Sequence, residues 1–185
     1  GVNNFIERLE KENRSIPKIL HVARNKSFYR IENNKLQYLL ATGEYENLKR
    51  EEGTRRFSEE RRTKKPLFSN KVASYFEIND DIGMVEFHSK ANALDGESMK
   101  LLSDAIDHSE INHRGMVIHN DASHFSCGVN LERIADFIEV HDWDGLDAFL
   151  EHFQKTVKKM KYSRIPVVSA PSGLSIGGGF EVVLH

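Results

Sequence analysis

Residues 165 to 181 read Ile-Pro-Val-Val-Ser-Ala-Pro-Ser-Gly-Leu-Ser-Ile-Gly-Gly-Gly-Phe-Glu, and this stretch decides the fold. The run from Ile165 to Ala170 is typical of a strand, and Gly177 to Gly179 come where a helix begins. Because glycine has no Cβ, these backbone amides can approach a ligand closely. Unpaired N–H groups at a helix start, at the positive end of its dipole, suit an anion that develops during a reaction. The stretch predicts a strand, an anion-stabilising loop and a helix.

The sequence before this stretch predicts strands that alternate with helices. Residues 79 to 83 contain Asn, Asp and Gly, which supply turn chemistry between two strands. Asp95 and Asn130 are residue types that cap helices, and apolar residues from Trp143 to Met160 repeat as on one stripe of a helix. We expect that stripe to pack in the core or against a subunit. The alternation predicts an α/β layer fold, with strands at 72–78, 84–87, 115–119 and 165–170 and helices at 95–109, 130–138 and 143–160.

Residues 1 to 68 differ in composition and charge from the rest of the chain. Residues 4 to 24 predict one or two short helices interrupted before Pro17, and the aromatic and branched runs 27–31 and 36–40 predict a hairpin around Asn33 and Asn34. Residues 44 to 68 are highly charged with few apolar anchors and indicate a linker. The net charge is +6 over residues 1 to 70 and −8 over residues 71 to 185, which also indicates a boundary. We therefore expect a linker segment at 1–68 and a separate domain at 69–185.

Bulk composition limits the classes of function. The 185 residues carry a net charge of −2, and no apolar run reaches the roughly 18 residues needed to cross a bilayer. The start lacks a signal-peptide pattern, and the single cysteine excludes an internal disulfide framework, so we expect a cytoplasmic protein without membrane contact. A nucleic-acid-binding arm is the other interpretation of the basic half. Interleaved glutamates favour a solvated linker over that arm, so we expect no nucleic acid partner.

Two other classes of loop compete at the glycines. Gly173 to Gly177 fits the G-x-S-x-G nucleophile elbow of serine hydrolases, with Ser175 as the nucleophile. That triad needs an acid and then a histidine further along the chain, and only Glu181 and His185 follow. A phosphate loop is disfavoured, because neither the G-K-[ST] ending nor the G-x-G-x-x-G fingerprint is present. An oxyanion site is therefore the better interpretation.

Glu181 lies in the first turn of the helix that follows the glycines. Its neighbours Phe180 and Val182 to Leu184 are apolar, and apolar surroundings raise the pKa of a carboxyl group toward neutrality, which suits proton transfer. The helix terminus opposes that shift. Taken alone, Glu181 is better explained as a carboxylate placed favourably against the helix dipole. Its position beside the glycines makes it a candidate catalytic residue.

Three blocks in the chain resemble the crotonase (enoyl-CoA hydratase/isomerase) superfamily. The first is the strand 84–87 followed by His-Ser-Lys-Ala-Asn-Ala-Leu-Asp at 88–95, and the second is 115–119 followed by His-Phe-Ser-Cys-Gly-Val-Asn-Leu at 124–131. The third is the stretch quoted at the outset. The resemblance implies an α/β crotonase-like spiral of ββα units that is incomplete at the C-terminus and is preceded by a helical and hairpin linker segment.

The resemblance also implies roles for particular residues. The backbone amides of Cys127 and Gly178 would form an oxyanion hole for a thioester carbonyl, and Glu181 would be one of two catalytic glutamates that handle a water molecule. The substrate would be a coenzyme A thioester, hydrated at its 2,3 double bond. The residues implied at the adenine end of coenzyme A are Lys90, Ala91, Leu94 and Ser126.

Several departures from the family pattern matter. The family's second glutamate lies about a helix and a strand beyond Glu181, and the sequence ends four residues after it, so we expect this stretch of chain to be inactive by itself. Asn130 stands where many members have Asp, and Cys127 where Ala is common. Cys127 could instead be a nucleophile beside His124, although a small buried role is commoner for cysteine. The histidine pairs lack metal-ligand spacing, so we expect no metal.

Residues 1 to 68 extend the resemblance to a bacterial architecture in which a 3-hydroxyacyl-CoA dehydrogenase precedes the crotonase domain. Asn4 to Leu9 and the hairpin that begins at Ser27 carry this resemblance. It implies a fatty-acid β-oxidation enzyme, with an NAD-binding domain upstream and no resident cofactor in the residues given. It also implies a possible homo-oligomer. A non-catalytic acyl-CoA-binding module is the alternative within the same fold.

Overall fold

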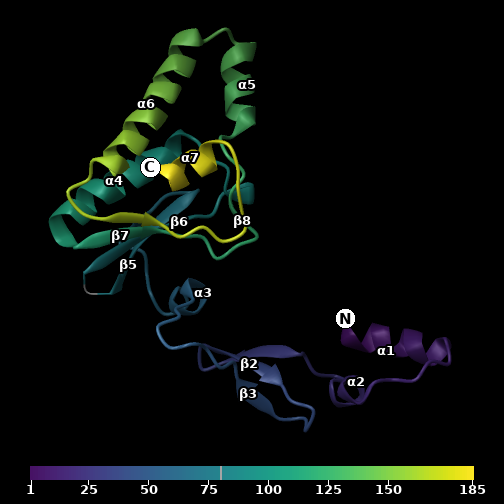
Figure 1. Ribbon diagram of the computed structural model, residues 1–185. Coiled ribbons are helices and arrows are strands. Elements are labelled where there is room, and N and C mark those ends of the chain that lie inside the picture. The colour runs from purple at the N-terminus through teal and green to yellow at the C-terminus, as the bar shows by residue number, and fades with distance from the viewer. Residues whose placement is uncertain (80) are drawn as a thin grey trace. The chain divides into compact units, whose positions relative to one another are not determined.

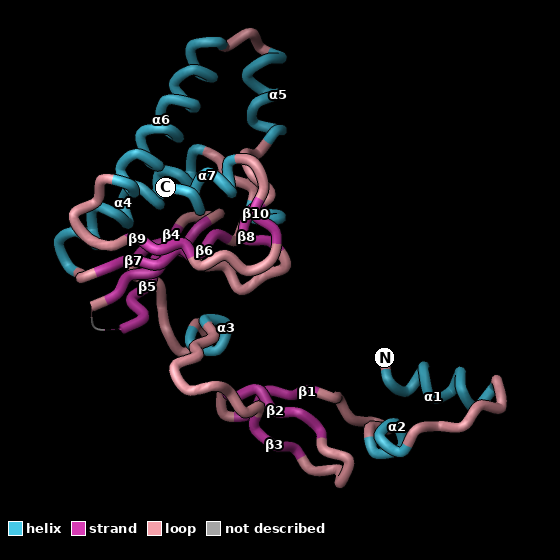
Figure 2. The backbone as a smooth tube through the Cα atoms, viewed as in Figure 1, coloured by secondary structure: helices cyan, strands magenta, loops and turns pink. Residues whose placement is uncertain are grey.

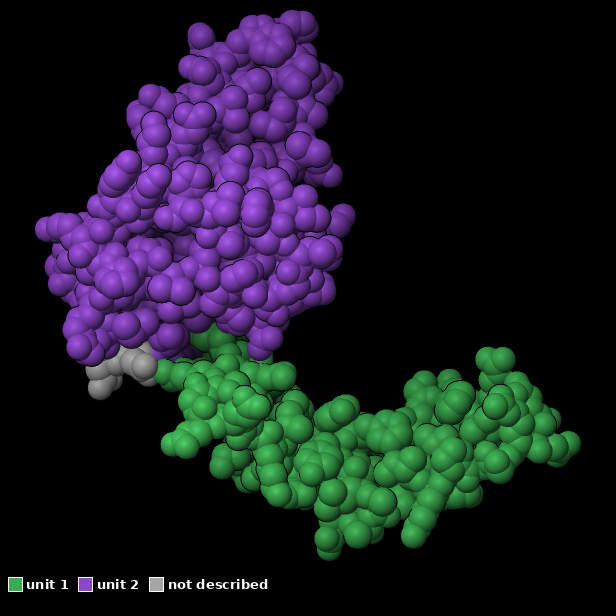
Figure 3. All heavy atoms as spheres, in the orientation of Figure 1, with its two compact units in different colours: residues 1–63 green, residues 64–185 purple. Residues whose placement is uncertain are grey.

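The computed structural model describes residues 1–79 and 81–185, and these form two compact units, Gly1–Thr63 and Lys64–His185 (Figures 1 and 3). The division precedes the expected boundary at 68/69 by a few residues. The reason is that β4 (Phe68–Ser69) pairs with β5 (Ala73–Asn79) and so belongs to the second unit. Part of the predicted turn at 79–83, Asp80, lies outside the described residues. In the part of the chain that is described, no helix has both the length and the apolar character needed to span a membrane.

The first unit contains the predicted short helices and hairpin. Helix α1 (Val2–Lys11) and helix α2 (Lys18–Val22) bury Ile6, Leu9 and Leu20 against one another, and Pro17 precedes the second helix as expected. Strands β1 (Tyr29–Glu32) and β2 (Lys35–Leu39) are antiparallel. Asn33 and Asn34 have φ of 49° and 62°, the left-handed values that a two-residue hairpin turn requires. The hairpin prediction is confirmed.

The segment 44–68, predicted as a linker, contains two short elements that the sequence pattern does not predict. Strand β3 (Tyr45–Asn47) adds to β2 as a third antiparallel strand, and helix α3 (Phe57–Glu60) buries Phe57 (Figure 2). The Tyr45 hydroxyl donates to the Ser27 carbonyl over 2.6 Å, and the Arg30 guanidinium lies 4.0 Å from the centre of the Tyr45 ring. Two aromatic residues, Tyr45 and Phe57, therefore supply anchors within this highly charged segment.

The second unit is built on a five-stranded sheet of order β4-β5-β6-β7-β9. Strands β5 and β6 (Ile82–Phe87) form the predicted hairpin, and β6, β7 (Gly115–Ile118) and β9 (Val167–Ser169) are parallel. A separate two-stranded parallel sheet consists of β8 (His124–Ser126) and β10 (Leu174–Ser175). The fold is the α/β layer arrangement that the alternating pattern predicts.

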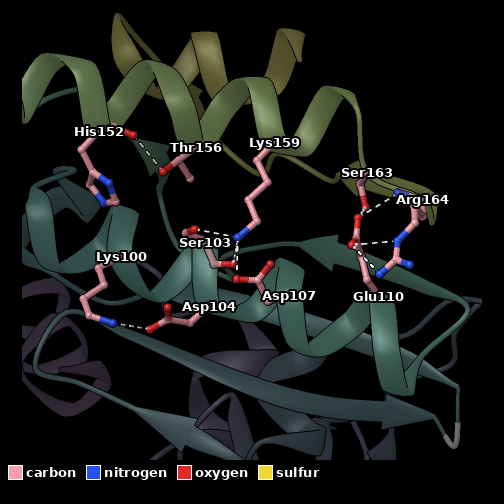
Figure 4. Close-up of polar contacts among 10 residues, drawn as sticks. All are labelled: Lys100, Ser103, Asp104, Asp107, Glu110, His152, Thr156, Lys159, Ser163 and Arg164. Atoms are coloured by element: carbon pink, nitrogen blue, oxygen red, sulfur yellow. Dashed lines mark hydrogen bonds and ion pairs between the residues drawn. The ribbon is translucent and has the colours of Figure 1, made fainter.

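Helix α4 (Gly96–Asn112) covers one face of the large sheet. Asp95 caps it as predicted, because its side chain accepts the Ser98 N–H while the Ser98 hydroxyl accepts the Asp95 N–H. Helix α6 (Trp143–Lys161) packs on α4, and Lys159 from α6 bonds Ser103 and Asp107 on α4 (Figure 4). The main core lies between α4, α6 and the sheet.

Helices α5 (Leu131–Glu139) and α6 form a hairpin that extends away from the sheet (Figure 1). Asn130 caps α5 as predicted, through an acceptor bond from the Glu132 N–H. Of the predicted α6 stripe, the second half packs in the core as expected, and the first half is exposed in this chain. Phe153, Val157 and Met160 are in the core, whereas Trp143 is 56 % exposed and α5 buries no residue. Periodicity identifies the apolar side of a helix but not how much of that side is packed against other elements.

Candidate active site

Two loops that are distant in sequence meet where β8 pairs with β10. Ser126 is in register with Ser175, and the Ile176 N–H donates to the Ser126 carbonyl over 3.0 Å. The chain leaves β8 toward Val129 and leaves β10 toward helix α7 (Gly178–Leu184). The parallel pairing therefore places the loop after β8 beside the glycine loop.

The glycines allow this close approach. A Cβ at Gly179 would lie 2.5 Å from the Ser126 Cβ, and a Cβ at Gly128 would lie 2.9 Å from the Ile176 carbonyl oxygen and 3.4 Å from the Gly178 nitrogen. Gly128 also has φ of +98°, in the region that favours glycine. A side chain at Gly128 or Gly179 would push the two loops apart.

The first predicted block joins the same site. The Leu94 N–H donates to the Gly128 carbonyl over 2.8 Å, and the Asn130 N–H donates to the Leu94 carbonyl over 2.7 Å. Just before Leu94 lies the 3₁₀ turn η1 (Lys90–Asn92), where Ala91 has φ of 54° and ψ of 21°. The structure thus brings together the three blocks that carry the resemblance.

The backbone amides of this site divide into used and unused donors. The Cys127 N–H donates to the Ala91 carbonyl over 3.1 Å, and the Gly128 N–H donates to the Ser126 hydroxyl over 3.1 Å. By contrast, the N–H groups of Val129 and Gly178 donate to no acceptor among residues 1–79 and 81–185. Gly178 is buried and Val129 is half-buried. A backbone N–H that has no acceptor within the protein can donate to a ligand, so these two amides are the candidate donors to a ligand oxygen at this site.

Glu181 lies in the first turn of α7, three residues after Gly178, and its own N–H donates to the Gly177 carbonyl over 3.1 Å. The side chain is exposed, which differs from the apolar surroundings that its sequence neighbours suggest. The reason is helical geometry: Val182 turns into the core while Phe180 and Glu181 turn outward. Glu181 is therefore free to meet a ligand at the same loop.

Of the four residues expected to bind coenzyme A, two are exposed and two are buried. Lys90 and Ala91 are exposed on η1, whereas the side chains of Leu94 and Ser126 are fully buried. Only the backbone of Leu94 and Ser126 is placed to contact a ligand, and that backbone is bonded to neighbouring loops.

The rival interpretations receive no geometric support. The Ser175 hydroxyl is buried and has no hydrogen-bond partner within the described part of the chain, whereas a nucleophile elbow presents its serine to a substrate. Cys127 is exposed, not the small buried residue that is commonest, and the buried Nδ1 of His124 bonds to no described group. Among the residues that the structure describes, no cluster of three possible metal ligands occurs.

Sequence reasoning missed three contributors to this site. The unused Val129 amide carries no signal in the sequence, because it depends on the direction in which one peptide group points. Asn92 and Asn120 donate their side-chain amides to the carbonyls of β8, and both are almost fully buried. Asn tolerates positive φ, as Asn92 shows at 51°, and this residue type beside Ala91 and Ala93 was the available hint for Asn92.

Comparisons with known proteins agree on one family. The sequence pattern of the enoyl-CoA hydratase/isomerase family matches residues 77–185. All of the chain aligns at 32 % identity with a protein of Bacillus subtilis named as a probable 3-hydroxyacyl-CoA dehydrogenase, and 65 % of it at 27 % identity with a protein of Rickettsia prowazekii named as a fatty acid oxidation complex trifunctional enzyme. The chain spans 24 % and 17 % of the lengths of these two relatives.

Solved structures give the same answer for the fold. An enoyl-CoA hydratase from Polaromonas superposes with a TM-score of 0.57 at 21 % identity, over 60 % of this chain and 44 % of that one. An enoyl-CoA hydratase from Bacillus anthracis superposes with a TM-score of 0.55 at 18 % identity, over 62 % and 45 %. The crotonase-like fold implied by the resemblance is therefore confirmed. Because the family pattern matches residues 77–185, more than half of its length, the chain belongs to the enoyl-CoA hydratase/isomerase family.

Proposed function

We propose that this chain binds an acyl-CoA thioester and takes part in the hydration of 2-enoyl-CoA to 3-hydroxyacyl-CoA. The observation that carries the proposal is the pair of unused amides, Val129 and Gly178, on adjoining loops. Two N–H donors to the same oxygen are what a thioester carbonyl needs when negative charge develops on it. Glu181 lies one helical turn away, where a carboxyl group can handle the water.

The two amides and the carboxyl group would share the reaction. Water adds its hydroxyl to C3 and a proton to C2. The negative charge that develops on the thioester oxygen during this addition would be stabilised by hydrogen bonds from the two N–H groups. Glu181 would act together with a second carboxyl group in moving the water's protons. Lys90 and Ala91, exposed on η1, are our candidates for contact with coenzyme A, through the Lys90 ammonium and the backbone.

We assign the first donor of the hole to Val129, two residues beyond the Cys127 expected from the sequence. The Cys127 N–H is engaged by Ala91, and the bonds of Leu94 to Gly128 and Asn130 leave the intervening Val129 N–H pointing away from Leu94. Cys127 in place of the usual alanine then needs no catalytic explanation.

The wider activity belongs to the same proposal. The dehydrogenase and trifunctional names of the two relatives support a β-oxidation protein that hydrates an enoyl-CoA and oxidises the 3-hydroxy product with NAD. Residues 1–63 would be the region that joins those activities. We also propose a cytoplasmic location and a homo-oligomer, with no nucleic acid or membrane partner.

The test is a hydration assay on the full-length protein, which follows the loss of the enoyl thioester absorbance. Glu181→Gln should lower kcat by about 10²-fold or more, since general acid–base catalysis typically contributes that much. Glu139→Gln, a matched change of an exposed glutamate on α5, should have no effect, and Ser175→Ala should stay active. Full activity in the Glu181→Gln protein, or loss only in Ser175→Ala, would overturn the proposal.

A further inference from the structure

We infer that Asn92 and Asn120 are positioning residues, which together hold β8 so that the Val129 amide faces the Gly178 amide. Among the residues that the structure describes, β10 is the one strand that pairs with β8. Two further carbonyl groups of β8, those of His124 and Phe125, are bound by side chains. The Asn92 amide donates to the His124 carbonyl over 2.8 Å, and the Asn120 amide donates to the Phe125 carbonyl.

Asn120 connects β8 to the large sheet. Its side-chain oxygen accepts the Phe87 N–H over 2.6 Å at the end of β6, while its nitrogen binds Phe125. The residue is 1 % exposed. Because a buried amide that loses one partner leaves a costly unpaired group, the two bonds hold both ends of the connection in place.

Asn92 connects β8 to the η1 turn. The residue is 6 % exposed and has φ of 51°, a conformation that asparagine adopts more readily than most residues. With Asn92 in place, the preceding Ala91 directs its carbonyl to the Cys127 N–H. One asparagine thus fixes His124 through its side chain and Cys127 through the adjoining peptide.

The two bonds fall on consecutive carbonyls, those of His124 and Phe125, which lie five and four residues before Val129. The residues between are held by Ala91 and by the Ser126 hydroxyl, so every amide from Cys127 to Asn130 except that of Val129 has a defined acceptor. Preorganised donors stabilise a transition state because they need no reorganisation as charge develops. Loosening β8 should therefore weaken the oxyanion hole more than it weakens binding of the coenzyme A portion.

The inference rests on the proposed hydratase function and is tested with the full-length protein and three variants. Asn92→Gly keeps the positive φ and removes the side-chain donor, while Asn92→Asp keeps the shape and replaces the donor with an acceptor. Asn112→Asp is the matched control, because Asn112 also donates to a carbonyl, that of His108 over 2.9 Å, but is exposed on α4. Both Asn92 variants should lose about 10-fold or more in kcat with KM within about two-fold, since small misplacement of a catalytic group costs that much.

A second measurement separates this role from folding and from the proposed function. The infrared carbonyl band of a bound, non-reacting acyl-CoA should shift downward in the wild type and in Asn112→Asp, and return toward its free frequency in both Asn92 variants. Equal kcat and an equal band shift in all four proteins would overturn the inference. So would a loss of kcat in the Asn92 variants that merely tracks a loss of folded protein.

If the wild type shifts the band but does not hydrate, the proposed function fails and the band alone decides the inference. If the wild type neither binds nor shifts the band, both fail.

Discussion

At the residue scale, the site depends on glycines, because these residues have no Cβ atom. Gly179 is the clearest case, because a Cβ there would lie 2.5 Å from the Ser126 Cβ and 2.9 Å from the Ser126 carbonyl oxygen, both in the buried seam between β8 and α7. Neither neighbour is the flexible end of a side chain. The glycine run is therefore required by packing as well as by its proposed chemistry.

We predict that Gly179→Ala lowers the free energy of unfolding by about 1–3 kcal/mol, the usual cost of overpacking, and abolishes acyl-CoA binding. Gly96→Ala is the control, since its Cβ would meet nothing within 4 Å at the start of α4. That change should be neutral or stabilising. Urea denaturation of both variants checks the prediction, and equal stability of the two would contradict it.

A buried polar cluster between the sheet and α4 should make stability depend on pH. Burial lowers the pKa of His113, which is hydrogen bonded to the Tyr75 hydroxyl over 2.8 Å; His108 adds to the lowering, while Glu77 and Asp81 oppose it. Burial also raises the pKa of Tyr75, so both groups are neutral near pH 7.

Because the folded state disfavours protonation of His113, the unfolded state binds more protons below the ordinary histidine pKa of about 6.5. Stability should therefore be full above that pH, decline as the pH falls below it, and level off below the lowered pKa of folded His113. Denaturation curves between about pH 5 and pH 8 measure this. In His113→Gln the decline should be smaller, and an unchanged profile would show that another group is responsible.

At the element scale, α4 and α6 are joined by polar contacts outside the apolar core (Figure 4). The Lys159 ammonium donates to the Ser103 hydroxyl over 2.9 Å and the Ser103 carbonyl over 3.0 Å, and lies 2.6 Å from Asp107. Farther along α4, Glu110 accepts from Ser163 and Arg164. The backbone N–H of Arg164 is the main cause that lowers the pKa of Glu110.

We predict that Lys159→Met lowers the free energy of unfolding by about 1–2 kcal/mol, because three partners lose a charged donor. Lys155→Met on the same helix is the control, since Lys155 pairs with the exposed Glu151, and such exposed pairs contribute little. Thermal denaturation should rank Lys159→Met clearly below Lys155→Met. The opposite order would assign the stability of the helix pair to apolar packing alone.

Local sequence patterns predicted those elements that are marked by a capping residue, a turn residue or an apolar repeat sustained over many residues. Asp95 and Asn130 cap helices as expected, and the Asn33-Asn34 turn forms. Strand β3 and helix α3 escaped prediction because three or four residues carry too little pattern to stand out from charge. The exposure of the first half of the α6 stripe cannot be predicted from its periodicity, because an amphipathic pattern does not show which other elements pack on the apolar side of a helix.

At the scale of the whole molecule, the sequence could identify the three blocks but not which amides face the substrate. That choice depends on the hydrogen bonds between η1, the loop after β8 and α7, which are set by contacts between distant segments. The resemblance therefore points to the loop after β8, while the proposal of Val129 in place of Cys127 needed the hydrogen bonds of the structure.

Binding of the proposed substrate should be visible in global stability. At a concentration about 100-fold above its Kd, an acyl-CoA should stabilise the full-length protein by about 2.7 kcal/mol, because ligand binds only the folded state. Free coenzyme A at the same concentration should stabilise less, since it lacks the thioester oxygen. Thermal denaturation with each ligand measures the difference, and equal effects would mean that the thioester group makes no contact with the hole.

The pairing of β8 with β10 has a consequence for how the protein is made. Ser126 and Ser175 are register partners although a helical hairpin and a sheet strand separate them along the chain. Such a contact has a large sequence separation. The entropy of closing the long intervening loop must therefore be lost before the strand pairing can stabilise the fold. During synthesis, α4 and β5 to β7 can assemble on the ribosome well before the glycine loop is translated. Catalytic competence would then be among the last properties acquired by the nascent domain.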